Sequence, residues 1–379
     1  MRKRLQTRYG LTVRRALTSV IPSKRMFERL GPALSTLGLK WDRSELPHLY
    51  RLAPLQTLRN CAPLIDPVFV PGATANHMRD DDDVIGLALD GEARAYPWWI
   101  LDNHHVANDT IAGLPVVVSL CEMCSSAVAF EAKVDERRLV FQTRYAYKGT
   151  NAFEDRQTKS LWSPYLGRAI TGPLRGKTLN LLPAQQMQWG AWRARYPESL
   201  VLHGSLGSRT GHGAGHTMGS PALSPDMRAT IPRWDHRLTH NTLVLGVMSG
   251  DRQRAYPLDA LREQAGVVND EFDGAPIVIL ADLAEGSAGA LAFSRRLDGR
   301  TLTFMPDVRG PVDVETGSLW THDGAAVAGP LVGARLRFVG SHVSEWFIWA
   351  AHFPEIELVL SADPSPVGSE PVSEPDLVS

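Results

Sequence analysis

The chain has 379 residues, of which 44% are hydrophobic and 21% charged, and its formal net charge is −1. This balance of charge argues against a dedicated nucleic-acid binder, and three cysteines are too few for a disulfide scaffold. No apolar run approaches the ~18 residues of a membrane span, so we predict a soluble, cytoplasmic protein of two or three domains.

The two ends of the chain differ in charge from the rest. Residues 1–44 are predicted to form a basic arm, because residues 1–27 hold eight Lys or Arg and no acidic residue. We interpret the arm as a solvated segment, with contact to a membrane surface or to an acidic partner as the alternative. Residues 361–379 are rich in Pro, Ser and acidic residues, which predicts a disordered tail.

An internal repeat is the main feature of the sequence between these ends. VIGLALDGEARAYP at 84–97 recurs as VLGVMSGDRQRAYP at 244–257, an offset of 160 residues. Other matched pairs are Asp155 with Asp313, Trp162 with Trp320, Trp189 with Trp346 and Trp192 with Trp349. We therefore predict two homologous units, residues 45–203 and 244–360, joined by a connector at 204–243.

Local patterns predict short strands and helices within each unit. In the first unit, apolar residues alternate around an Asp-Gly pair, which predicts a β-hairpin that ends at Pro97. The run LPVVVSL at 114–120 predicts a buried strand, and Trp189 and Trp192 predict the apolar face of a short helix. Further strands are expected at 139–142, 160–162 and 178–182. The predicted fold class is α+β, mainly β, with an internal duplication of two units that each combine a sheet with short helices.

The connector contains two histidines, His212 and His216, in the segment GHGAGHTM. Their spacing would place both on one face of a helix, but three nearby glycines make a helix unfavourable. We interpret the segment as a flexible loop, and the alternative is a loop that brings a ligand to a neighbouring site.

Cys121 and Cys124 form a C-x-x-C motif directly after the predicted strand at 114–120. Two thiols three residues apart at a turn can converge on one point, where they serve a metal ion or a dithiol couple. His104 and His105 are candidates for further ligands, as are Cys61, His77 and the connector histidines. Two buried, inert cysteines are the alternative interpretation.

The second unit lacks this set of side chains. At an offset of 161 residues, the counterparts of Cys121, Cys124, His104 and His105 are Asp282, Glu285, Ala265 and Gly266. One active and one degenerate copy would produce this pattern.

A second motif, D-x-x-T-x-S-L-W, begins at Asp155 and recurs in the second unit. Its presence in both units favours a role in shaping a turn, because Asp and Thr side chains bond nearby backbone amides. The alternative makes Asp155 a catalytic-site residue that orients a ligand. The sequence contains no P-loop and no G-x-G-x-x-G, so we expect no nucleotide cofactor.

Together these motifs resemble a bacterial and archaeal family known as domain of unknown function 3179, over about residues 64–360. The family's hallmarks stand here as AYP at 95–97, NHHVAND at 103–109, CEMCSSA at 121–127 and DRQTKSLW at 155–162. His105 stands where the family has Glu, Asn103 where it has Trp, and Glu122 where it has Pro. The resemblance implies the extent of the fold and no particular activity.

Our leading hypothesis is a metal-binding protein whose first unit holds a transition metal through Cys121, Cys124 and His104, with His105 as a fourth ligand or a neighbouring group. Mixed thiolate and imidazole ligands favour copper, zinc or iron, and we expect copper slightly ahead of the others. An open coordination position would support redox or Lewis-acid catalysis on a small molecule, with Cys121, Cys124, His105 and Asp155 as the catalytic residues. The alternatives are a metal-free thiol enzyme and a non-catalytic binding scaffold.

Overall fold

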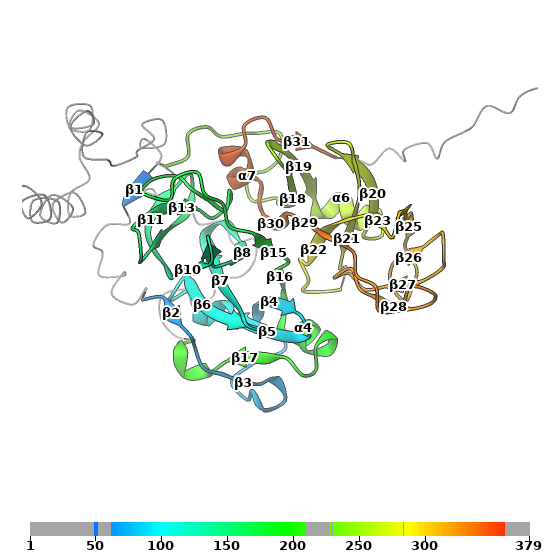
Figure 1. The fold of residues 1–379 in the computed structure, drawn as a ribbon, viewed down its shortest axis with the longest axis horizontal. Helices are drawn as coiled ribbons and strands as arrows, with labels where there is room; N and C mark the ends of the chain where they lie inside the picture. The colour runs from blue at the N-terminus through cyan, green and yellow to red at the C-terminus, as the bar shows by residue number, and fades with distance from the viewer. Residues whose placement is uncertain (1–48, 52–61, 210–227, 229, 283, 361–379) are drawn as a thin grey trace, which may run out of the picture.

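The computed structural model describes residues 49–51, 62–209, 228, 230–282 and 284–360 (Figure 1). The basic arm, the C-terminal tail, Cys61, His212 and His216 lie outside these residues. In the described part the chain is mainly β, as predicted, with several small sheets and four short α-helices. No helix among those residues is long and apolar enough to cross a membrane.

The predicted β-hairpin is confirmed and lies at the centre of the first sheet. Its strands are β4 (Asp83–Leu89) and β5 (Glu92–Pro97). Asp90 and Gly91 between them have φ of 46° and 85°, the left-handed pair that a tight hairpin turn requires. The sheet also contains β3 (Phe69–Pro71), β16 (Gln185–Gln188) and β17 (Leu200–Leu202). The helix α3 (Trp98–Leu101) follows β5 directly.

The predicted buried strand is β7 (Leu114–Cys121), the middle strand of the second sheet. Its neighbours are β2 (Leu64–Ile65), β6 (Val106–Ile111), β8 (Ser126–Glu131) and β15 (Leu181–Leu182). Val116 and Val118 pack in the core cluster of the hairpin, whereas Val117 packs in a different cluster with Trp162. A strand covered on both faces has no polar side to present, which explains its continuous apolar run.

A third sheet completes the first half and covers one face of β7. Its strands are β1 (Leu49–Arg51), β11 (Phe141–Tyr147), β12 (Thr150–Asp155), β13 (Leu161–Ser163) and β14 (Arg168–Ala169). The predicted strands at 139–142 and 160–162 are present but begin one or two residues later. At 178–182 only Leu181 and Leu182 pair as a strand, and Thr178 makes an isolated bridge to Arg168. The remaining pieces are η3 (Gly72–Thr74), η4 (Glu122–Cys124), β9 (Lys133–Val134), β10 (Arg137–Arg138) and η5 (Gly204–Leu206).

We call the elements up to η5 the first half of the protein and those from β18 onward the second half. The second half consists of β-sheets with two helices. One sheet contains β18 (Leu243–Ser249), β19 (Arg252–Pro257), β30 (Ser341–Glu345) and β31 (Glu357–Leu358). Another contains β20 (Val267–Phe272), β21 (Ala275–Ala281), β22 (Ala290–Ser294) and β29 (Phe338–Val339). The smaller strands are β23 (Arg296–Leu297), β24 (Arg300–Thr301), β25 (Phe304–Met305), β26 (Val312–Asp313), β27 (Leu319–Trp320) and β28 (Ala326–Ala328). The helices are α6 (Leu258–Glu263) and α7 (Trp346–His352).

The predicted tryptophan helix is α4 (Trp189–Arg195), and it packs on the hairpin sheet. Gly86 provides the space: a Cβ built there would lie 2.2 Å from the Trp192 ring. In the second half, α7 packs on β18 in the same manner, and a Cβ at Gly246 would lie 2.1 Å from Trp349.

The two halves meet along β16 and β30. Figure 1 shows α7 between the first-half strands around β13 and the second-half strands β18 and β19. The Gln186 side chain donates to the carbonyl oxygens of Ser125, at 3.2 Å, and of Val343, at 2.9 Å, so one buried amide contacts both halves. Met187 forms a backbone bridge with Ser287. The halves therefore share a buried interface.

Substitution of Gly86 by Ala should lower the free energy of unfolding by about 1–3 kcal/mol, because the new methyl group must displace the buried Trp192 ring. The matched control is Gly340→Ala, since a Cβ there would be 3.8 Å from its nearest neighbour and should cost little. Urea unfolding of both variants measures the difference. Equal stability of the two variants would contradict the tight fit of Trp192 against β4.

Candidate functional site

The C-x-x-C motif forms a tight turn at the end of the buried strand. Cys121 is the last residue of β7, Glu122–Cys124 form a single 3₁₀ turn, and Ser125 has φ of 47° before β8 begins. Cys121 and Ser126 are paired across the two strands, so the turn between them is short. The location predicted for the two thiols, at a turn directly after a buried strand, is confirmed.

Both cysteines are reduced and buried, with exposed fractions of 3% for Cys121 and 0% for Cys124. The Cys124 sulfur lies 3.6 Å from the carbonyl oxygen of Cys121 and 3.5 Å from the hydroxyl of Thr150. Burial raises the pKa of the Cys124 thiol well above its usual value, and the neighbouring Cys121 thiol raises it further. Cys124 is therefore a thiol, not a thiolate, at neutral pH.

The second half covers the two thiols. Cys121 and Cys124 belong to one apolar cluster with Tyr165 of the first half and with the α7 residues Trp346 and Trp349. Met123, from the middle of the motif, is half-buried against the same cluster. The thiols thus lie at the contact between the halves, in surroundings that are mostly apolar.

Glu345, the last residue of β30, is a buried carboxyl group beside this turn. Its exposed fraction is 1%, and it accepts a hydrogen bond of 3.1 Å from the Ser125 hydroxyl. Burial raises the pKa of Glu345 to about 8, and the bond from Ser125 lowers it only in part. Ser125, which donates this bond, directly follows Cys124, so the carboxyl group lies beside the C-x-x-C turn.

His342, three residues before Glu345 on β30, is the most unusual polar group at this interface. It is 2% exposed, and among the described residues neither ring nitrogen has a hydrogen-bond partner. Burial lowers the pKa of His342 to about 3, so the ring is neutral. Leaving a buried donor and acceptor unpaired costs about 1–3 kcal/mol for each group. The fold retains a costly side chain at this place.

Tyr165 connects His342 to the cysteine turn. Its ring meets the His342 ring edge-on, with centroids 4.8 Å apart, and stacks on His352 at 4.7 Å. Tyr165 packs in one apolar cluster with Cys121 and Cys124, and burial raises the pKa of its hydroxyl well above the usual value. Two histidines from the second half and two cysteines from the first half therefore surround one tyrosine.

The histidines predicted as ligands have different surroundings. The His104 ring lies 2.6 Å from the carbonyl oxygen of Ala62 through Nδ1 and 2.7 Å from that of Leu206 through Nε2. His105 is buried with φ of 58°, and its Nδ1 lies 3.3 Å from the Glu122 carboxylate. The structure therefore brings His105 to the middle of the C-x-x-C motif, whereas His104 contacts two backbone carbonyls.

In the part of the chain that the structure describes, no group of three or more His, Cys, Asp or Glu side chains is arranged around one point to hold a metal ion. His77, another predicted candidate, lies 2.9 Å from the carbonyl oxygen of Leu202. The set of Cys121, Cys124, His104 and His105 as metal ligands therefore remains a prediction.

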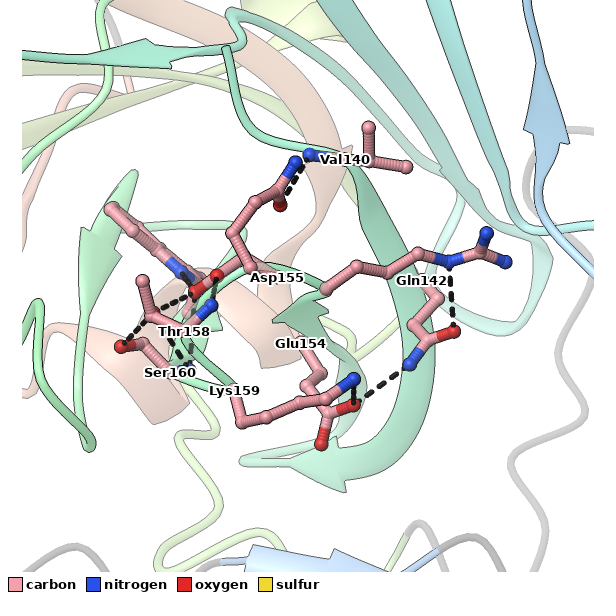
Figure 2. Close-up of polar contacts among 10 residues, drawn as sticks. Val140, Gln142, Glu154, Asp155, Thr158, Lys159 and Ser160 are labelled. Carbon is pink, nitrogen blue, oxygen red and sulfur yellow. Dashed lines mark hydrogen bonds and ion pairs between the residues drawn. The ribbon is translucent and has the colours of Figure 1, made fainter. Parts of the chain in front are cut away.

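Asp155 is the centre of a closed set of hydrogen bonds (Figure 2). Its carboxylate accepts from the Thr158 amide at 2.5 Å and from the Thr158 hydroxyl at 2.8 Å. It also accepts from the Ser160 amide and from Trp162 Nε1, both at 3.1 Å. Asp313 accepts the same four kinds of bond, including one of 2.9 Å from Trp320 Nε1. These contacts favour the turn-shaping role of Asp155 over a role beside a ligand.

Sequence reasoning missed three residues that lie at the thiol site: Tyr165, His342 and Glu345. Each lies close in sequence to a residue that matches in the predicted repeat, yet differs from the residue at its own matching position. The counterparts are Asp323, Gln185 and Gln188. A search for positions that differ between the two predicted units, next to positions that are identical, would have included all three residues.

Comparison with known proteins identifies a family. Residues 59–356 match the family described as Protein of unknown function (DUF3179), in agreement with the resemblance of its motifs. Neither a curated protein nor a solved structure matches the chain.

Replacing Asp155 by Asn should destabilise the protein by about 2–4 kcal/mol, because the amide nitrogen cannot accept the buried N–H groups that the carboxylate now pairs. Asp313→Asn should cost a similar amount, since its contacts are the same. Asp135→Asn, at an exposed surface ion pair, is the control and should have little effect. A loss of stability at Asp313 but not at Asp155 would exclude a shared structural role.

The Glu345→Gln variant should become more stable relative to the wild type as the pH rises from about 5 to about 8. The folded-state pKa of Glu345 is about 8, above the unfolded value, so in this range the folded protein keeps a proton that the unfolded chain has lost. Rising pH therefore destabilises the wild type at this group, by an amount on the order of a few kcal/mol, and Gln removes the effect. Urea unfolding at several pH values measures it. The exposed Glu136→Gln serves as control, and a difference that stays constant with pH for Glu345→Gln would refute the assignment.

Proposed function

This chain belongs to the DUF3179 family, and because the family description states no activity, we propose a function from the site itself. We propose that the protein binds a soft transition-metal ion, copper ahead of zinc or iron, between the sulfur atoms of Cys121 and Cys124. The observation that carries the proposal is a pair of adjacent, reduced cysteines buried where the two halves meet.

The chemistry of the two sulfurs favours copper. Thiolate ligands are soft and select Cu(I), zinc and iron over magnesium or calcium. Structural zinc needs four ligands, and the described residues offer no preformed group of three. Cu(I) accepts as few as two thiolates, and Met123 adds a soft thioether to the same cluster.

In this proposal the two adjacent histidines have separate roles. His105 acts as a positioning residue, because its contact with Glu122 reaches the middle of the C-x-x-C turn. His104 binds the carbonyl oxygens of Ala62 and Leu206, which joins the segment before β2 to the turn after β17. In this proposal Cys121 and Cys124 are the ligands, and neither His104 nor His105 binds the ion directly.

We also infer that the chain arose by duplication of one unit. The order of hairpin, helix, strands and tryptophan helix is the same in both halves. Asn108 exchanges two backbone bonds with Phe141, and Asn269 exchanges two with Phe304. Two further matched sets are Arg94–Asp109–Tyr96 and Arg254–Asp270–Tyr256. The second half therefore has the same polar contacts as the first but has no counterpart of the C-x-x-C motif. This difference supports a function located in the first unit.

A bound ion would supply redox or Lewis-acid chemistry to a small molecule at an open coordination position. Trp346 and Trp349 would provide apolar surroundings for the ion, and Tyr165 and Glu345 would provide hydrogen-bonding groups. The metal-free thiol enzyme is less well supported, because a buried and protonated Cys124 is a poor nucleophile.

Metal analysis of the full chain, purified without oxygen, tests the proposal. The wild type should carry about one transition-metal ion per chain, and Cys121→Ala and Cys124→Ala should each lose most of it, because a single thiolate binds weakly. Cys61→Ala removes the third cysteine of the chain, itself a candidate ligand from the sequence, and it should keep the metal because the proposed site uses Cys121 and Cys124.

A wild type without stoichiometric metal, also after anaerobic incubation with Cu(I), would refute the proposal. Equal metal content in the wild type and in both C-x-x-C variants would refute it as well. In either case the non-catalytic binding scaffold becomes the better interpretation.

A further inference from the structure

We propose that His342 supplies a nitrogen ligand to the metal ion held by Cys121 and Cys124, so that the two halves build the site together. This inference rests on the function proposed above and names a ligand that the sequence motifs do not contain.

The first support is the path of β30, which runs across the cysteine turn. Glu345 at its end accepts a bond from Ser125, the residue after Cys124. The carbonyl oxygen of Val343 and that of Ser125 accept from the same Gln186 amide. His342 directly precedes Val343 on this strand, and its ring contacts Tyr165, which packs in one apolar cluster with both cysteines. Strand β30 therefore brings His342 to the cluster that holds the thiols.

The second support is the state of the His342 ring. The ring is almost fully buried, and neither nitrogen has a hydrogen-bond partner among the described residues. Trp349 and Tyr165 pack against it with centroids at 4.5 Å and 4.8 Å, and neither contact satisfies the lone pair. A neutral imidazole with a free lone pair is the form that binds copper or zinc.

The third support comes from the corresponding place in the other half. Gln185 lies opposite Gly86, which makes room for Trp192, just as His342 lies opposite Gly246, which makes room for Trp349. Gln185 is therefore the counterpart of His342.

Around Gln185, the residue that corresponds to His342, the side chains of both halves are in contact. Arg195 donates to Gln185 at 3.1 Å and to Asp282 at 2.6 Å. By the offsets of the repeat, the counterparts of Arg195 and Asp282 are His352 and Cys121. A single side chain, that of Arg195, spans the gap between Gln185 and Asp282. By the same correspondence, we infer that His342 and Cys121 are separated by about the length of one side chain.

His342 is a better ligand than the other polar groups nearby. His352 places its Nδ1 3.0 Å from the carbonyl oxygen of Ile348 and stacks on Tyr165, which holds its ring in the helix. Glu345 offers a hard oxygen, which soft ions disfavour. Because the described side chains form no closed group of three, binding must bring the His342 ring toward the sulfurs.

The experiment is an anaerobic Cu(I) titration of the full chain against a chromophoric Cu(I) chelator. The variants are His342→Gln and His342→Leu, with His203→Gln, a histidine on the exposed turn after β17, as the matched control. Both His342 variants should bind Cu(I) about tenfold more weakly or worse, and the control should bind as the wild type does. Copper X-ray absorption should show imidazole scattering in the wild type and its loss in His342→Leu.

A purely structural role for His342 would give a different result. In the metal-free protein, Leu replaces an unpaired polar ring by an apolar side chain, so His342→Leu should unfold at the same or a higher urea concentration than the wild type. Weaker copper binding together with unchanged or raised metal-free stability supports the ligand role, whereas a parallel loss of both overturns it.

The outcomes separate this inference from the function on which it rests. If the wild type binds Cu(I) through sulfur but shows no imidazole scattering, or the His342 variants bind as tightly as the wild type, only the role of His342 is overturned. If the wild type binds no Cu(I) at all, the proposed function fails, and the ligand role of His342 fails with it.

Discussion

Burial of β7 on both faces is the constraint on which the thiol site depends. One face of the strand packs with the hairpin core and the other with the core around Trp162, so the strand cannot move without disturbing both. Cys121 is the last residue of this strand, and Cys124 follows after a single tight turn. The sulfur atoms therefore take their position from a strand that is packed on both faces.

The interface between the halves is polar where it meets this site and apolar around it. Gln186, Ser125 and Glu345 form buried hydrogen bonds there, while the aromatic rings of α7 pack in one cluster with the neighbouring cysteines. Buried polar groups of this kind stabilise one relative placement of two bodies, because any other placement leaves them unpaired. The His342 ring takes no part in that pairing, since neither of its nitrogens has a hydrogen-bond partner among the described residues. A buried ring with two unpaired nitrogens opposes stability, and such a side chain points to a functional reason for its presence.

Features that depend on neighbouring residues could be predicted from the sequence. The hairpin, β7 and α4 follow from alternation, an apolar run and tryptophan spacing, and the role of Asp155 follows from its recurrence in both halves. Features that depend on distant residues could not. Ser125 and Glu345 are 220 residues apart and meet only because the halves pack together. His104 and His105 are adjacent, but the left-handed backbone at His105 gives the two rings different partners, which no spacing rule foresees.

The ion pair of Arg195 with Asp282 has a consequence for how such a chain can change over time. At one end of the interface, Arg195 of the first half forms an ion pair with Asp282 of the second half, and this pair joins the two halves. On the inferred duplication, the cysteine turn occupies the matching place at the other end. The cysteine turn also joins the halves, through the hydrogen bond from Ser125 to Glu345, so polar contacts hold the halves together at two separate places. A substitution at the cysteine turn therefore leaves a second connection between the halves in place, the ion pair of Arg195 with Asp282.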